Sequence, residues 1–180
     1  GTPEADLLPL GGRGHAGIGG SAGTRLFSVQ DVHIGWVEAL RELGVQTAEF
    51  NLEDRIAFYA NAEINGQRLD PEAAADLAVN GLYSACYQFW PDVLLVTSGF
   101  FVKPEMFDRI RARGTKIVLL HTEEPYQHDE EIDRAAHADI SIVNDPTFLD
   151  EYTQPAWYQP HCYRPKVHCP GPYELASDFC

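Results

Sequence analysis

Two adjacent carboxylates, Glu123 and Glu124, come directly after the apolar run KIVLLH and its following threonine. Neighbouring carboxylates raise each other's pKa, and such a carboxylate can act as a general base toward a hydroxyl group. Acidic residues also stabilise the first turn of a helix, and a helical pattern starts near residue 128. The pattern therefore offers Glu123 either as a catalytic base or as a residue that favours the start of a helix.

A second polar group, Asn144-Asp145-Pro146, ends the next apolar run, DISIV. Its amide and carboxylate are suited to contact a ligand at the end of a strand. Aspartate before a proline at the first helical position is also good capping chemistry. Both interpretations of Asn144 and Asp145 stay open at this point.

His33 lies two residues before Gly35 in an otherwise regular helical pattern. Glycine inside a helix costs about 1 kcal/mol relative to alanine, so its presence indicates the close approach of another group. That group is either a neighbouring strand or a substrate. In the second case His33 is a candidate for acid–base chemistry.

Two His-Cys pairs, His161-Cys162 and His168-Cys169, contain side chains that zinc accepts. The gap between them exceeds the spacing of about two to four residues that is typical of close zinc ligands, and Pro165 lies within it. We therefore predict no metal site. The sequence also lacks a Ser-His-Asp order and a Walker-type phosphate loop.

The elements that must position these residues alternate between strands and helices. The near-continuous apolar runs at 92–98 and 116–122 are typical of strands covered on both faces, and helical patterns follow each of them. The sequence thus predicts a three-layer, Rossmann-like α/β domain with a mostly parallel sheet. Strands are expected at 25–29, 45–50, 92–97, 116–121, 139–143 and just before Pro160-His161, and helices at 31–44, 53–64, 71–90, 104–114, 128–137 and 146–152.

In a parallel sheet the carboxyl ends of the strands meet at one edge, which is where ligands bind in open α/β folds. Each polar group above follows a strand or begins the next helix. We therefore expect a cleft at this edge, with a common space faced by Asp31, His33, Glu123, Tyr126, Asn144 and His161.

The composition restricts the kind of partner. The chain has 180 residues and a formal net charge of −14, which argues against nucleic acid or an anionic membrane surface as the main partner. Its four cysteines form no visible disulfide framework, so a reduced, cytoplasmic location is expected. No apolar run is long enough to cross a membrane.

The first 24 residues differ from the rest because they are rich in glycine and have no periodicity. They contain Gly12-x-Gly14-x-x-Gly17, formally a dinucleotide-binding pattern. That motif requires a strong strand before it and a helix after it, and here a proline precedes and further glycines follow. We interpret residues 1–24 as an atypical leader.

Several segments, taken in order, resemble the N-terminal half of the CgeB-like (spore maturation protein) glycosyltransferases. The segments are SVQDVHIGWVEALRELG, AEFNLEDRIAFY, LLHTEEPY, SIVNDPTFLDEY and QPHCYRPKVHCPGP, and the resemblance covers about residues 26–180. The family's acidic loop reads Thr-Glu-Ser-Pro-Tyr, so Glu123 and Tyr126 match and Glu124 departs. Its Asn-Asp-Pro and Pro-His elements fall on Asn144-Asp145 and on His161.

The resemblance implies one half of a GT-B fold, in which two Rossmann-like domains flank a cleft. The implied reaction moves a sugar from a nucleotide donor to an acceptor hydroxyl without a metal or further cofactor. Glu123 is then the expected base, with His33 second, and the substrate-binding residues are Asp31, Tyr126, Asn144, Asp145 and His161.

The resemblance also divides the chain. Residues 25–170 correspond to the acceptor-side domain, and 171–180 to the start of an interdomain linker. The donor-binding domain of the family has no counterpart in the sequence, so we expect the chain to be incomplete alone and a second domain or chain to be its partner.

A non-catalytic flavodoxin-like or carbohydrate-binding module is the alternative, because the same alternating pattern supports many functions. A flavodoxin should carry a Ser/Thr-rich phosphate loop after its first strand, and the glycine tract is a poor substitute.

Overall fold

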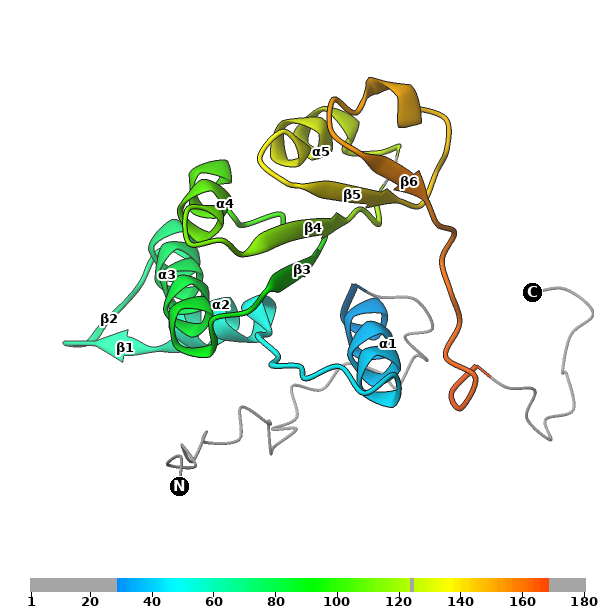
Figure 1. Cartoon of the computed structure of the whole chain (residues 1–180). Helices are drawn as coiled ribbons and strands as arrows, with labels where there is room; N and C mark the ends of the chain where they lie inside the picture. Colours follow the sequence, from blue (N-terminus) through cyan, green and yellow to red (C-terminus); the bar gives the residue numbers. More distant parts are fainter. Residues whose placement is uncertain (1–28, 124, 169–180) are drawn as a thin grey trace, which may run out of the picture.

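The structure, a computed structural model, describes residues 29–123 and 125–168. These residues form five α-helices, a short 3-10 helix and six strands (Figure 1). The helices are α1 (Val29–Glu42), α2 (Leu52–Asn61), α3 (Pro71–Phe89), α4 (Pro104–Arg111), α5 (His128–Ala135) and the 3-10 helix η1 (Leu149–Glu151). The strands are β1 (Glu63–Ile64), β2 (Gln67–Arg68), β3 (Val93–Thr97), β4 (Lys116–Leu120), β5 (Ile140–Val143) and β6 (Ala156–Tyr158).

The main sheet has four strands in the order β3-β4-β5-β6, and all neighbouring pairs are parallel. Its order follows the chain, with a helical connection between each pair of strands. The predicted α/β class and the parallel sheet are confirmed, and the arrangement is consistent with a Rossmann-like fold. The strands predicted at 92–97, 116–121 and 139–143 correspond to β3, β4 and β5.

One face of the sheet is packed against helices. Ile117 and Leu119 of β4 lie in a core with Leu82 of α3 and with Phe107 and Ile110 of α4. A smaller cluster joins α5 to β5 and to Tyr152 just after η1. Buried and half-buried residues alternate along β5 and over Ile117–Leu119 of β4, as a strand's geometry requires, and Leu120 is buried as well.

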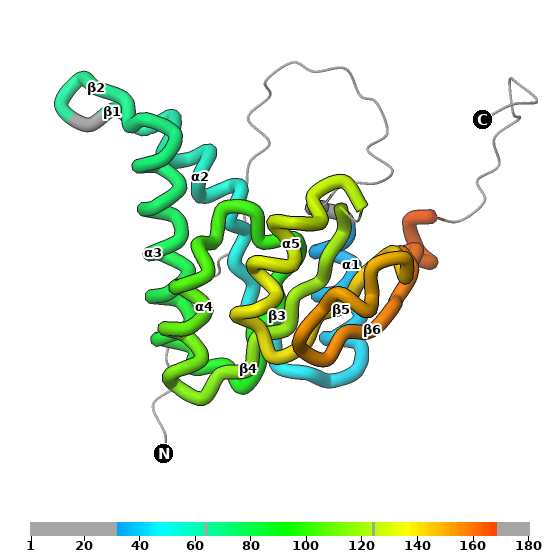
Figure 2. The backbone as a smooth tube through the Cα atoms, turned by 90° about the horizontal axis from the view of Figure 1, so that it is seen from above, coloured from blue at the N-terminus to red at the C-terminus, as the bar shows by residue number. Residues whose placement is uncertain are grey.

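The opposite side of the sheet is less covered. Seen from above, α4 and α5 lie in front of the strands and α1 lies behind them (Figure 2). Val118 of β4 and Ile142 of β5 are only half-buried, and none of the described side chains of α1 is buried. Helix α1 thus packs with partly buried apolar side chains, among them Ile34, Trp36 and Val37.

Local chemistry explains the long helix α3. Asp70 caps its start by accepting a hydrogen bond from the Ala73 N–H (2.9 Å), and Pro71 occupies the first helical position. Trp90 ends the helix in the left-handed conformation, with φ of 52°. Between these ends a stripe of apolar side chains at helical spacing is buried: Ala74, Ala78, Val79 and Leu82.

The prediction of a strand at 45–50 was wrong, because these residues form no ladder in the described chain. Gly44 (φ 78°) ends α1 as expected for this position, and the Val45 N–H donates back to the Leu40 carbonyl (3.0 Å). Further along, the Phe50 ring lies 3.4 Å from the Cβ position of Gly81, and it packs against the core beside α3. Local bonds and side-chain packing hold this segment instead of strand pairing.

Two other elements differ from the prediction. The helix expected through residue 64 ends at Asn61, and the antiparallel pair β1–β2 follows, closed by Asn65-Gly66 with φ of 54° and 76°. The helix expected at 146–152 is only η1, since Asp145 forms a local turn before it.

The predictions for the leader 1–24, for the strand at 25–28 and for the linker 171–180 lie outside the described residues. Val29, the last residue of that predicted strand, begins α1.

Candidate functional site

The loops that follow β4, β5 and β6 all lie at the carboxyl edge of the sheet, because these neighbouring strands are parallel. They carry Glu123, the pair Asn144-Asp145, and His161. The topology therefore places the backbone of three predicted site segments along one edge. We call this edge, with the residues just named and Tyr126, the carboxyl-edge site.

The backbone around Glu123 is fixed on both sides. Before it, the Thr122 hydroxyl contacts the hydroxyl of Ser98, a buried residue directly after β3 with φ of 61°. After it, the Tyr126 N–H donates to the Glu123 carbonyl oxygen (2.7 Å), which closes a turn. Glu123 is half-buried, whereas the Tyr126 side chain is 87% exposed. The acidic loop thus combines a fixed backbone at Glu123 with an exposed aromatic ring at Tyr126.

A buried polar cluster, which sequence reasoning missed, lies directly below this loop. His121 and Glu131 are both 0% exposed, and His121 Nδ1 lies 3.3 Å from Glu131 Oε2. His121 Nε2 lies 3.1 Å from Ser141 Oγ, which also accepts a hydrogen bond from Gln154 Nε2 (3.2 Å). Because Gln154 donates to Ser141, the serine hydrogen is available to Nε2, which leaves a hydrogen on Nδ1 facing Glu131.

Arg134, one turn after Glu131 on α5, adds a cation to this cluster. Burial of its side chain lowers its pKa, and the nearby Glu131 acts in the opposite direction. Among the described residues, His121 Nδ1, Arg134 Nε and Nη2 and both Glu131 oxygens make no contact that meets hydrogen-bond geometry. In the sequence, Glu131 and Arg134 fit the pattern of an acidic helix start followed by a solvated helix face. The one sequence feature that indicated their burial was the helical spacing of Glu131, Arg134 and Ala135, which places the three residues on one face of α5.

The predicted pair after β5 has a defined local structure. Asp145 Oδ1 accepts a hydrogen bond from the Thr147 N–H (2.8 Å), and hydrogen bonds from the Thr147 side chain and backbone lower the Asp145 pKa. Asp145 thus closes a local turn and does not cap a helix at Pro146, because the next helical element, η1, begins only at Leu149. The carboxylate stays ionised and partly exposed, so it can also accept hydrogen bonds from a ligand.

The structure pairs His33 with Glu49 rather than with another predicted site residue. His33 Nε2 lies 3.9 Å from Glu49 Oε2, and Arg41 Nη2 lies 2.5 Å from the other oxygen of the same carboxylate. Asp31 lies in the first turn of α1, and its side chain lies outside the described residues. His161 is exposed after β6. Convergence of His33, Glu123 and His161 on one space thus stays a prediction.

Among the described residues, the close approach expected at Gly35 is made by a side chain and not by a strand. The nearest atoms are Arg164 Cγ and Cδ, at 3.1 and 3.2 Å from the Cβ position of Gly35. The glycine therefore makes room for a side chain from the segment that follows β6.

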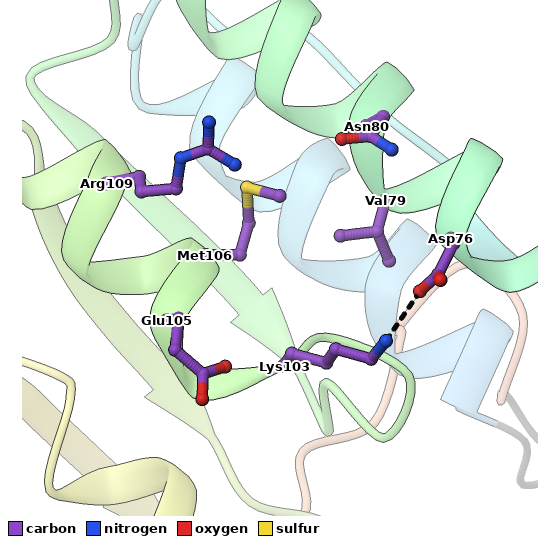
Figure 3. Close-up of a pocket in the computed structure, with 7 residues that line it drawn as sticks. All are labelled: Asp76, Val79, Asn80, Lys103, Glu105, Met106 and Arg109. Atoms are coloured by element: carbon purple, nitrogen blue, oxygen red, sulfur yellow. Dashed lines mark hydrogen bonds and ion pairs between the residues drawn. The ribbon is translucent and has the colours of Figure 1, made fainter.

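Two hollows in the described surface lie away from the predicted residues. One, of about 150 Å³, lies between α3 and α4, where Lys103 reaches across to Asp76 (2.9 Å; Figure 3). The other, of about 300 Å³, lies beside the turn before β4 and includes Asp108, Thr115 and Asp139. Their charged side chains largely pair with one another, for example Lys116 with Asp139 (3.0 Å). Neither hollow extends the carboxyl-edge site.

Within residues 29–123 and 125–168, no group of three or more His, Cys, Asp or Glu side chains could hold a metal ion. In the same part of the chain, no helix has the length and apolar character needed to cross a membrane.

Comparison with known proteins identifies no relative: no family model, no curated protein and no solved structure matches the chain.

Proposed function

We propose that this chain is the acceptor-side domain of a GT-B-type glycosyltransferase of the CgeB-like kind, acting in transfer of a sugar from a nucleotide donor to an acceptor hydroxyl. The observation that carries the proposal is the alignment of three polar loops, after β4, β5 and β6, along one edge of a parallel sheet. Such an edge is the usual ligand-binding position in open α/β folds. The resemblance of these same loops to the family's motifs supports the assignment.

In this proposal Glu123 removes the proton of the acceptor hydroxyl as that oxygen attacks the sugar carbon. Glu123 is half-buried, and the Thr122 and Tyr126 contacts fix the backbone from which its carboxylate extends. Held geometry of this kind lowers the entropic cost of bringing base and hydroxyl together. His33 is the second candidate base, and its imidazole lies beside Glu49 on α1's side of the sheet rather than in the acidic loop.

The other residues of the edge bind rather than react. Because Thr147 lowers its pKa, Asp145 is a weaker base than an ordinary aspartate and suits hydrogen bonding to sugar hydroxyls. Asn144 offers an amide, and His161 offers an exposed imidazole. The exposed ring of Tyr126 provides an apolar surface for the carbon face of a sugar.

Donor binding is assigned to a second domain or chain. The leaving diphosphate requires positive groups or backbone amides for charge stabilisation. With a formal net charge of −14, this chain is poorly suited to attract that group by itself.

A ligand panel tests the proposal against its alternatives. The purified chain is titrated, by calorimetry and by NMR, with methyl glycosides as acceptor probes, with nucleotide sugars, and with flavin mononucleotide. We expect saturable binding of at least one glycoside, weakened by about tenfold in Glu123→Gln or His161→Ala, and no binding of the nucleotide compounds. A tenfold loss corresponds to about 1.4 kcal/mol, which is the scale of one lost hydrogen bond to a charged group.

The other outcomes have separate meanings. Tight binding of flavin mononucleotide favours the flavodoxin-like alternative. Glycoside binding that both substitutions leave unchanged contradicts the site. Hydrolysis of a nucleotide sugar by the chain alone, abolished in Glu123→Gln, overturns the division of donor and acceptor roles.

A further inference from the structure

The segment after β6 runs alongside α1, although more than 120 residues separate them in sequence (Figure 1). Arg164 and Glu38 join the two with a two-pronged contact: Arg164 Nε donates to Glu38 Oε2 (3.1 Å), and Nη2 donates to Oε1 (2.9 Å). Two parallel bonds of this type fix the orientation of both groups as well as their distance. The Glu38 carboxylate on α1 therefore fixes the position of the segment that follows β6.

The aliphatic part of Arg164 is seated on Gly35, one turn before Glu38. Its Cγ and Cδ approach so closely that a Cβ at residue 35 would lie 3.1 and 3.2 Å from them. The side chain of Arg164 is only 19% exposed, compared with 50% for Glu38. Gly35 thus leaves room for the aliphatic part of Arg164, and Glu38 binds the guanidinium group of the same side chain.

The segment folds around the same residue. The backbone N–H groups of Val167 and His168 donate to the Arg164 carbonyl (3.0 and 2.8 Å), and the Arg164 N–H donates to His168 Nδ1 (3.0 Å). A second, more exposed ion pair joins Lys166 to Glu42 one turn further along α1 (2.7 Å). Arg164 is therefore held by its backbone, its aliphatic stem and its guanidinium at once.

These contacts matter because none of the described side chains of α1 is fully buried. Its apolar side chains are only partly buried, so polar contacts with the segment after β6 add to the hydrophobic attachment of the helix. The helix carries His33, and the segment that grips it carries His161, three residues before Arg164. The contact consequently joins the two segments that carry the histidines His33 and His161.

We propose that Arg164 is a positioning residue. By binding Glu38 and packing on Gly35, it holds the segment that carries His161 against α1, which carries His33, and we call this set of contacts the clasp. The clasp thereby positions this side of the carboxyl-edge site. The positional role depends on the proposed function, whereas the clasp itself does not. Because part of the pair is solvent-exposed, the clasp weakens as ionic strength rises.

Hydrogen exchange of the backbone amides tests the clasp without any ligand. Arg164→Gln is expected to speed exchange in the second half of α1 by about fivefold at low salt, the scale of a well-formed partly exposed ion pair. Glu38→Gln is expected to do the same. The reversed pair, Glu38→Arg with Arg164→Glu, should restore slow exchange, and amides of Ile117 and Leu119 in the core serve as the reference for global stability.

Lys166→Gln is the matched control, since it removes one positive charge from the same segment at a more exposed pair. Equal acceleration in Lys166→Gln and Arg164→Gln contradicts the clasp, as does equal acceleration of the core amides. Unchanged α1 exchange in Arg164→Gln also overturns it.

The positional role has its own readout. The ring resonances of His33 and His161 in NMR spectra should both shift in Arg164→Gln and return in the reversed pair. If α1 exchange changes while these rings do not respond, Arg164 stabilises the helix without positioning the histidines. Failure of glycoside binding, in contrast, removes the proposed function and leaves the exchange result intact.

Discussion

His121 and Glu131 form a fully buried contact between the end of β4 and the first turn of α5, with 3.3 Å between Nδ1 and Oε2. The contact lies two residues before Glu123, so it anchors the strand end from which the acidic loop departs. It connects the packing of the core to the geometry of the carboxyl-edge site.

Removing one member of this pair is expected to destabilise the fold strongly. His121→Leu leaves the Glu131 carboxylate buried without its partner, and Glu131→Leu leaves the His121 imidazole buried without its partner. Each substitution should lower the free energy of unfolding by about 3 kcal/mol. The double variant should cost clearly less than the sum, because it removes both polar groups together. Urea unfolding of the three variants measures this, and additive losses would show that the two side chains do not interact.

Asp139 is predicted to stabilise the domain in a pH-dependent way. Partial burial alone raises its pKa, but the Ile117 N–H (2.9 Å), the Lys116 ammonium (3.0 Å) and the nearby Arg111 outweigh this and lower it. A depressed folded-state pKa gives stability that is present above the unfolded value of 3.8 and is lost as the pH falls through the folded value.

Asp139→Asn should therefore cost about 1–2 kcal/mol at pH 7. The difference from the unsubstituted chain should close below about pH 4. Unfolding curves at pH 7, 5 and 3 provide the measurement. Asp76→Asn, at the exposed pair with Lys103, is the control with a smaller expected loss. A gap that is constant from pH 7 to pH 3 would contradict the electrostatic explanation.

Arg113 is expected to stabilise the end of α3 by stacking rather than by hydrogen bonding. Its guanidinium carbon lies 3.7 Å from the Tyr87 ring centroid and 3.8 Å from that of Trp90, and no described residue hydrogen-bonds its Nη1 or Nη2. Arg113→Ala should cost about 1–2 kcal/mol and change the fluorescence of Trp90. Arg109→Ala, where one ring lies at 5.1 Å, should cost less, and equal losses would contradict the stacking explanation.

The parallel sheet could be predicted from the sequence because its strands carry strong local signals. VLLV and IVLL are apolar throughout, and the proline and glycine residues around α4 mark its ends. The strand expected at 45–50 could not be judged in the same way. Whether an extended segment pairs depends on a neighbour distant in the chain, and here Phe50 packs against α3 instead.

The candidate site also has a part that the sequence predicts and a part that only the structure reveals. Parallel topology was enough to place the loops of Glu123, Asn144 and His161 on one edge. The sequence could not reveal that Glu131 is buried, because it lies in an acidic run typical of a solvated face. Likewise, Gly35 indicated a close approach, but only the fold shows that Arg164 makes it.

A sugar acceptor is proposed to bind at the carboxyl edge. Chemical-shift mapping during a glycoside titration tests this binding most directly. We predict that the amide resonances of Glu123, Asn144 and His161 shift together and saturate at one concentration. Those of Asp108 and Thr115, at the hollow beside the turn before β4, should not shift. Shifts confined to that hollow, or no saturable shift at the carboxyl edge with any glycoside, would contradict it.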